Sequence, residues 1–284
     1  MTGPASRDRY ACTRESLTGG PHSHKVDGRV RCPVSLIEPA KTAAHDVIRL
    51  SLLGSFDLRR NESETLLPAL TGEAQRLLAL LALRGRRVSR TSIAGTLWPD
   101  ASEKHAHASL RSALSRLSAL GQDAVAITDT DLELSPGVSV DLHDARRLAH
   151  RLLDPSPVET SLADLRAEAV QVLSLDCLPD WYDEWILVEA EEWRQLRLHA
   201  LAALAIALAQ EQRFGDAIGA ALAAIRADPL RESAWATLIR VHLAEGNQSE
   251  AFRAFEQYFQ IVTRELKVEP TPALRALLPQ HDVS

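Results

Sequence analysis

Hydrophobic and polar residues alternate over the stretch VIRLSLLG, which covers residues 47–54. Ile48, Leu50 and Leu52 fall on one side of this stretch, and Gly54 ends it. A period of two is typical of a half-buried strand, so we predict a strand here. FDLRR at 56–60 predicts a second strand, and TLLPAL at 65–70 predicts a short third one.

After residue 70 the hydrophobic pattern changes to helical spacing. Thr71 is a candidate N-cap for a helix that runs to Arg84 and ends at Gly85. A second short helix fits SRTSIAGTLW, with Ser89 as its cap, Pro99 closing it, and Ile93, Leu97 and Trp98 pointing inward. A third is predicted from about Ser102 to Leu120, ended by Gly121.

The third predicted helix has two chemically different sides. Its apolar residues recur at helical spacing and form one stripe, which consists of Ala106, Leu110, Ala113, Leu114 and Leu117. The remaining sides carry Arg111, Arg116, histidines and small serines. Small residues among arginines allow a helix to approach DNA closely, whereas long acidic side chains would repel phosphate.

Two short apolar segments, AVAIT at 124–128 and LELS at 132–135, follow this helix. Asp129, Thr130 and Asp131 separate them, and the turn Pro136–Gly137 leads on to VSVD. We interpret this region as a hairpin. Strands, three helices and a hairpin in this order describe a winged helix-turn-helix, in which the hairpin is the wing and the third helix enters the DNA major groove.

From Leu162 onward the pattern is helical and contains an internal repeat at an offset of 34 residues. Five apolar positions of the first unit (Leu201, Leu204, Ala217, Ala221, Ala224) align with Trp235, Leu238, Ala251, Phe255 and Tyr258. Pro229 stands between the units. This spacing is typical of tetratricopeptide helix pairs, which stack on their neighbours to complete a core and leave a surface for partners.

The fold class that follows is mainly α with a small β component, in which a winged-helix domain precedes an all-α domain of tetratricopeptide-like helices. We predict a disordered extension at 1–45, a winged-helix domain at 46–142 and the helical domain at 143–280. The extension is rich in Gly, Pro, Ser, Thr and His, and it shows neither helical nor strand periodicity.

The net charge of −6 conceals an uneven distribution of charge along the chain. Residues 76–120 hold eight cations against two anions, a local balance of +6. From residue 159 to the end there are 11 cations and 20 anions. Such asymmetry is expected when one domain faces phosphate and another does not.

Composition and motifs argue against several other classes of protein. The three cysteines form no CxxC pair, and His22, His24 and Cys32 have the wrong spacing for a closed metal site, so we expect no metal or disulfide. With no apolar run of eighteen residues and no leader-like segment, we expect a cytoplasmic protein without membrane contact.

The sequence also gives no support for catalysis. DWYDEW places Asp180, Asp183 and Glu184 beside three aromatic residues, but no nucleophile, metal-ligand set or GxxxxGK[ST] loop accompanies these carboxylates. We interpret the cluster as a helix start whose aromatic residues pack into the core. We expect no catalytic residue and no cofactor.

Several strings resemble the SARP (antibiotic regulatory protein) group of actinomycete activators over residues 47 to about 275. In the N-terminal half these are LSLLGSFDLR, QRLLALLALRGRRVSR, TLWPD and SLRSALSRLSAL. In the C-terminal half they are WYDEW, LRESAWATLIRVHLAEGN and LKVEPTPALRALL. The group joins an OmpR-like winged helix to a bacterial transcriptional activator domain.

The resemblance implies an activator that binds direct repeats in double-stranded DNA and contacts RNA polymerase holoenzyme, with self-association as a further possibility. Its candidate DNA-binding residues are His107, Arg111, Ser112, Ser115 and Arg116, together with Arg90 and Lys104. Arginine can bind guanine bidentately, and serines mostly contact phosphate. Thr71 and Ser102 either cap their helices or bind phosphate; for Ser102 we favour capping.

Some features fit other interpretations. Arg84, Arg86 and Arg87 end a helix, where cations favour the helix dipole and solvent. The wing carries acidic residues at its tip, which puts a DNA contact there in question. Glu103 and Lys104 alternatively belong to a loop that faces RNA polymerase. An interaction adaptor whose winged helix no longer binds DNA is therefore the main alternative. A sensor that holds a small molecule in the helical concavity is a third possibility.

Overall fold

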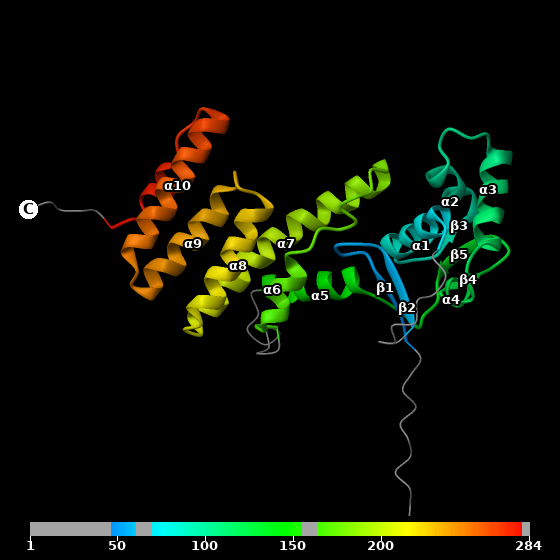
Figure 1. Ribbon diagram of the computed structural model, residues 1–284, viewed down its shortest axis with the longest axis horizontal. Helices are drawn as coiled ribbons and strands as arrows, with labels where there is room; N and C mark the ends of the chain where they lie inside the picture. The colour runs from blue at the N-terminus through cyan, green and yellow to red at the C-terminus, as the bar shows by residue number, and fades with distance from the viewer. Residues whose placement is uncertain (1–46, 61–69, 155–163, 280–284) are drawn as a thin grey trace, which may run out of the picture. The chain divides into compact units, whose positions relative to one another are not determined.

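The computed structural model describes residues 47–60, 70–154 and 164–279, shown in Figure 1. The predicted disordered extension at 1–45 lies outside the described residues, as do His22, His24, Cys12 and Cys32. All of the predicted third strand except Leu70 also falls outside them. The described part is mainly helical with two small sheets, which is the predicted fold class.

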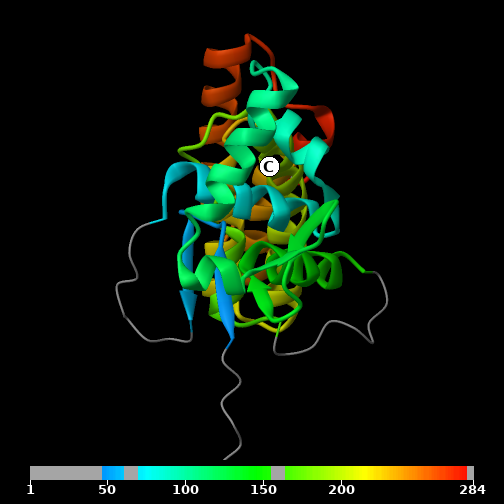
Figure 2. The ribbon, with the colours of Figure 1, turned by 90° about the vertical axis from the view of Figure 1, so that its right-hand side faces the viewer.

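The first sheet begins with the two strands expected from the alternating pattern. Strand β1 (Ile48–Ser51) pairs antiparallel with β2 (Asp57–Arg60), and Leu50 lies opposite Leu58. The two strands are drawn in blue in Figure 2. The third member is β6 (Val138–Val140), which pairs parallel with β1. The VSVD segment is therefore not part of the wing, because its backbone hydrogen bonds go to β1.

The second sheet contains the wing. Strand β4 (Val125–Ile127) pairs antiparallel with β5 (Asp131–Leu134), which confirms the hairpin across Asp129 and Thr130. The other edge of β5 pairs with β3 (Val88–Ser89), so the order is β3-β5-β4. The two-residue strand β3 is too short to leave a periodic signal and was not predicted.

The first two helices begin and end where their capping residues predict. In α1 (Gly72–Arg84), Thr71 Oγ1 accepts a hydrogen bond from the backbone N–H of Ala74, and Gly85 ends the helix at φ 58°. In α2 (Arg90–Leu97), Ser89 Oγ accepts from the N–H of Ser92. Ile93 and Leu97 are buried, as expected, whereas Trp98 is only half-buried.

The third predicted helix is shorter than its hydrophobic stripe suggested. Helix α3 covers Glu103–Ser115, and a separate short helix, α4, covers Ala119–Asp123. Ser118 separates them, because its Oγ accepts from the N–H of Gly121 and caps α4. Gly121 therefore lies inside α4 and does not end α3, and Leu117 and Leu120 are buried on either side of the break.

Helix α5 (Asp141–Leu153) connects the first sheet to the C-terminal helices and was not predicted. Its first residue ties it to β1: the Asp141 carboxylate accepts hydrogen bonds from the backbone N–H groups of Leu52 and Leu53, at 2.8 and 3.2 Å. Desolvation by burial raises the pKa of this carboxyl, although these hydrogen bonds act in the opposite direction. The predicted boundary between residues 142 and 143 falls inside α5 and stays a prediction.

The turn after β1 also contacts the segment that follows α6 (Ala167–Leu173). The backbone N–H of Leu178 donates to Leu52 O at 2.9 Å, and that of Gly54 donates to Asp176 O at 2.8 Å. Phe56 stacks on Trp181 with ring centroids 5.8 Å apart. The winged helix and the C-terminal helices therefore share backbone hydrogen bonds as well as side-chain contacts.

The C-terminal helices confirm the internal repeat. The first unit is the second half of α7 (Glu184–Gln210) with α8 (Phe214–Ala227), and the second is α9 (Glu232–Glu245) with α10 (Gln248–Leu266). Their inter-helix turns have equivalent hydrogen bonds 34 residues apart, Arg213 N to Leu208 O and Asn247 N to His242 O. The short helix α11 (Pro272–Arg275) follows α10.

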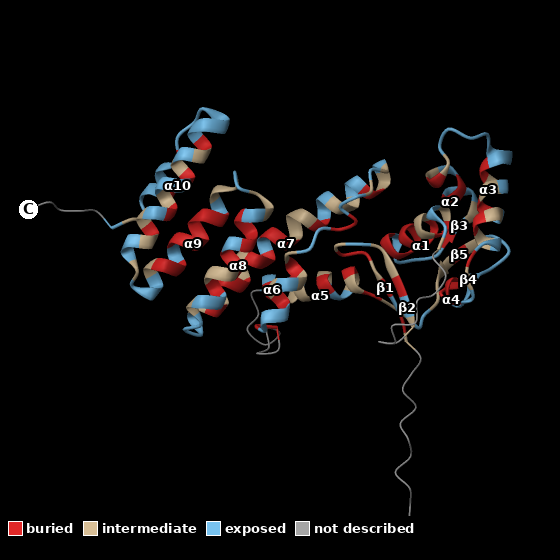
Figure 3. Ribbon diagram, viewed as in Figure 1, coloured by how far each residue is buried: buried red, intermediate tan, exposed pale blue. Residues whose placement is uncertain are grey.

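The two helix pairs share a buried interior. The positions aligned by the repeat are buried in both units except Phe255, which is half-buried. Figure 3 shows buried residues in red along α8 and α9. Pro229 lies between α8 and α9, as predicted. The aromatic cluster before α7 packs less completely than expected, because Tyr182 is 80% exposed while Trp181 and Trp185 are half-buried. No helix in the described ranges is long and apolar enough to cross a membrane.

The two repeat units provide a stability test in which the same substitution has opposite effects. Gly246 has φ 86°, a left-handed conformation that costs a residue with a Cβ about 1 kcal/mol, so Gly246→Ala is expected to lower the free energy of unfolding by that amount. Gly219 lies within α8, where an added methyl group would meet open space. Gly219→Ala is therefore expected to raise the free energy of unfolding by about 0.5–1 kcal/mol. Urea unfolding followed by circular dichroism measures both, and equal signs would contradict the repeat geometry.

Candidate nucleic-acid interface

Helix α3 exposes one continuous face to solvent. Lys104, Ala108, Arg111 and Ser115 recur at helical spacing and are all exposed, which puts them on one line along the helix. His105 is exposed beside this line. We call these five residues and Ser112, which is half-buried at the edge of the line, the outer face of α3.

The opposite side of α3 is fixed in the core of the winged helix. Ala106, Leu110 and Ala113 are each at most 3% exposed, and Leu114 is half-buried. Ala106 and Leu110 pack in the same core as Leu77 and Leu81 of α1 and Ile93 of α2. The core therefore sets which way the outer face points.

The two cations of the outer face have no acidic partner among the described residues. Arg111 and Lys104 are exposed, and neither forms an ion pair there. Between them lies Ala108, and beyond them Ser112 and Ser115, so no long side chain separates the cations from an approaching surface. A groove with phosphate walls is the kind of surface that this combination fits.

The other predicted residues of α3 are less accessible to an approaching ligand or already bonded within the protein. His107 is on the flank, half-buried, with its Nε2 4.0 Å from Glu103. Ser115 Oγ donates to the backbone carbonyl of Ser112 at 2.9 Å, which leaves its lone pairs available as acceptors. Ser102 stands at the N-cap position but makes no capping hydrogen bond, because its Oγ lies 3.0 Å from His105 Nδ1. Ser102 is thus the N-cap residue, as expected, but its side chain does not supply the capping hydrogen bond.

Arg116 differs from Arg111 although the sequence pattern treats them alike. It is the C-cap residue of α3, since the helix ends at Ser115. Its guanidinium lies 3.6 Å from the Glu73 carboxylate at the start of α1. The charge of Arg116 is thus partly balanced within the protein.

Arg90 supports the wing from the start of α2. Its Nε and Nη2 donate to the carbonyl oxygen of Thr128, at 3.3 and 3.0 Å. The wing turn is closed by Thr128 Oγ1, which accepts from the N–H of Asp131 at 3.0 Å. Asp129 is exposed at the tip of this turn, so the wing presents an acid where a DNA-binding wing would present a cation.

Most other cations of the basic stretch have partners inside the protein. Arg76 forms an ion pair with Asp183, and Arg84 lies 4.0 Å from Glu189. Arg87 pairs with Glu133 at 2.8 Å, a hydrogen bond that raises the pKa of this arginine. Carboxylates thus balance part of the local charge of +6, whereas Lys104 and Arg111 on the outer face of α3 keep their full charge.

The candidate DNA-binding residues predicted from the sequence did not include His105 and Ala108, which belong to the outer face. Both follow from helical spacing once Lys104 and Arg111 are placed on it. No group of three or more potential metal ligands occurs within the described ranges. Burial raises the pKa of the Cys177 thiol to about 12, so this cysteine is an inert core residue in the native protein.

The two sides of α3 predict separate effects on stability. Lys104→Ala and Arg111→Ala remove exposed side chains and are expected to change the free energy of unfolding by less than about 0.5 kcal/mol. Leu110→Ala removes a side chain that is 1% exposed and is expected to cost about 3 kcal/mol. Chemical denaturation distinguishes these outcomes, and a large loss in the Arg111 variant would mean that this arginine has a structural role.

Comparison with known proteins agrees with this geometry. Residues 140–280 match the model of the bacterial transcriptional activator domain. Regulatory protein AfsR of Streptomyces griseus is 26% identical over 261 residues, which is 88% of this chain and 26% of that protein. AfsR of Streptomyces coelicolor is 25% identical over 248 residues, 84% of this chain and 24% of that protein.

The chain thus spans about a quarter of the length of these curated relatives. Among solved structures, Mycobacterium tuberculosis EmbR, determined in complex with a low-affinity phosphopeptide, superposes with a TM-score of 0.61. The match covers 82% of this chain and 66% of EmbR at 23% identity, and it shows a shared fold. With a winged helix before a match to the bacterial transcriptional activator domain at residues 140–280, the chain is similar to regulatory proteins and has the domain order expected from its resemblance to the SARP group.

Proposed function

We propose that this protein activates transcription by binding double-stranded DNA with the outer face of α3. The observation that carries the proposal is that Lys104 and Arg111 are exposed on this face without an acidic partner in the described part of the chain. Elsewhere in the basic stretch, several arginines pair with carboxylates. In this proposal Arg111 binds a base edge and Lys104 binds phosphate.

The remaining predicted residues contribute to DNA binding to different extents. Ser112 and Ser115 contact the DNA backbone beside Arg111, and His107 contacts it from the flank. Arg116 contributes less than Arg111 because Glu73 shares its charge. Arg90 acts by holding the wing turn through Thr128 O. The wing itself stays away from phosphate, since Asp129 would be repelled by it.

The proposed target and partners rest on the resemblance to the SARP group. We propose that the DNA site is a direct repeat upstream of a promoter, and that the bound protein contacts RNA polymerase holoenzyme. The acidic helical half is suited to protein contacts, self-association included, because its charge disfavours DNA. Selection of bound DNA from random oligonucleotides tests the arrangement, and an inverted repeat would contradict a head-to-tail site.

An interaction adaptor remains the second candidate. It is favoured by the acidic wing tip and by the net charge of −6. The two functions differ in one measurable property, since an adaptor has no affinity for DNA at low salt. Catalysis is not proposed, in keeping with the regulatory relatives.

Fluorescence anisotropy with the selected DNA tests the role of the outer face. Arg111→Ala is expected to weaken binding by about 1–3 kcal/mol and to relax preference at one base position. Lys104→Ala is expected to weaken binding to all DNA sequences alike. It is also expected to reduce the slope of log K against log salt concentration by about 1. Arg240→Ala removes an exposed arginine of α9 and is the matched control, expected to change neither quantity.

The ion pair of Arg116 gives a further prediction for the same assay. Arg116→Ala is expected to weaken DNA binding less than Arg111→Ala, because Glu73 already balances part of its charge. Glu73→Gln removes that balance and is expected to strengthen binding slightly, by at most about 1 kcal/mol. If Arg116→Ala were the more damaging change, the assignment of the outer face would be wrong.

A further inference from the structure

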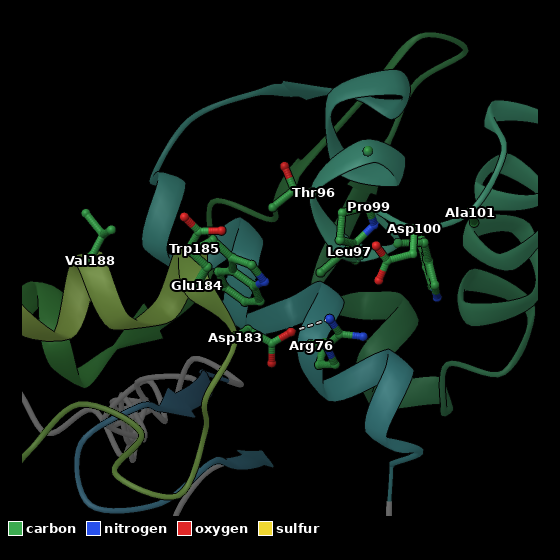
Figure 4. Close-up of a pocket in the computed structure, with 12 residues that line it drawn as sticks. Arg76, Thr96, Leu97, Pro99, Asp100, Ala101, Asp183, Glu184, Trp185 and Val188 are labelled. Atoms are coloured by element: carbon green, nitrogen blue, oxygen red, sulfur yellow. Dashed lines mark hydrogen bonds and ion pairs between the residues drawn. The ribbon is translucent and has the colours of Figure 1, made fainter.

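A cleft opens between the end of α2 and the start of α7. It has a volume of about 850 Å³ and is open to solvent. One wall is the segment from Gly95 to Ala101, and the other is the segment from Asp183 to Val188, with Arg76 of α1 at the base. Figure 4 shows side chains of both walls turned toward the space between them. Such a volume accommodates a small ligand.

The charge of this cleft is negative. Asp100, Asp183 and Glu184 line it together with a single cation, Arg76. Arg76 forms an ion pair with Asp183, which leaves the carboxylates of Asp100 and Glu184. Both are exposed, and neither has a cationic partner within the part of the chain that the structure describes. The cleft therefore favours a cation and disfavours an anion.

Two tryptophans and a valine contribute to the apolar lining of the cleft. Trp98 and Trp185 are both half-buried and line it from opposite walls, and Val188 extends the second wall. The indole N–H of Trp185 is shielded from solvent and has no acceptor among the described residues. Indole faces beside carboxylates are the arrangement that recognises organic cations, through cation–π attraction together with charge.

We propose that this cleft is a binding site for a small organic cation with an apolar body. The carboxylates of Asp100 and Glu184 attract the charged group, and Trp98 and Trp185 contact the apolar body. One wall immediately precedes α3 and the other begins the activator domain's longest helix, so the bound cation contacts both domains at once. The site is separate from the outer face of α3, and the proposal does not depend on DNA binding.

Isothermal titration calorimetry of the full chain with benzyltrimethylammonium tests the proposal. Saturable binding is expected, with phenylacetate and benzyl alcohol, the anionic and neutral analogues, binding roughly tenfold or more weakly. Equal binding of all three compounds would mean an unselective apolar surface and would overturn the proposal. So would the absence of saturable binding in the millimolar range.

Variants then locate the site. The double change Asp100→Asn with Glu184→Gln is expected to weaken the cation roughly tenfold. Trp185→Leu is expected to weaken binding of the cation too. If that variant does not fold, the double variant of the exposed residues Asp100 and Glu184 still tests the site. Glu192→Gln with Glu211→Gln removes two exposed charges of α7 and its C-cap away from the cleft and is expected to leave binding unchanged. Equal losses in both double variants would show general attraction to an acidic protein and would contradict a defined site.

Discussion

The division of α3 into a buried side and an exposed side is the constraint on which the functional account depends. Leu110, at 1% exposure, and its neighbours Ala106 and Ala113 hold the helix in the winged-helix core. With that side fixed, Lys104 and Arg111 have no route inward and stay in solvent. A helix anchored in this way presents its charges in a defined orientation, which recognition of a groove requires.

Ion pairs within the protein leave fewer cations available to bind DNA than the sum of charges suggests. Arg76, Arg87 and Arg116 count as basic residues in the sequence, yet each lies beside a carboxylate in the folded protein. Their partners come from the N-cap of α7, the wing strand β5 and the start of α1, so no local window of sequence contains these pairs. A balance of +6 over residues 76–120 therefore overstates what an external phosphate would meet.

The sequence predicted most helices and strands because their signals are local. Thr71, Ser89 and Gly85 act within one turn of the helices that they begin or end. The repeat at 34 residues was also visible, since both units have the same burial pattern. Two failures had different causes. The Ser118 cap that divides α3 from α4 is local, but it lies inside the apolar stripe that the prediction followed. The pairing of β6 with β1 is a tertiary contact between segments more than eighty residues apart in the chain.

The candidate site was predicted in part for the same reason. Helical spacing placed Arg111 on the polar side of α3, but it could not show that Glu73 lies beside Arg116 or that Arg90 binds Thr128. The cleft between α2 and α7 was invisible to any local pattern, because its walls are about ninety residues apart. Nothing in the sequence alone brings Trp98 toward Trp185.

Photo-crosslinking from the outer face of α3 tests the central claim most directly. A p-benzoylphenylalanine in place of Ser115 lies at the exposed end of the line that contains Arg111, and the same group in place of Leu222 lies on α8. The account predicts a covalent adduct with the selected DNA from position 115 and none from position 222. Efficient crosslinking from position 222 alone, or from neither position while the DNA is bound, would contradict it.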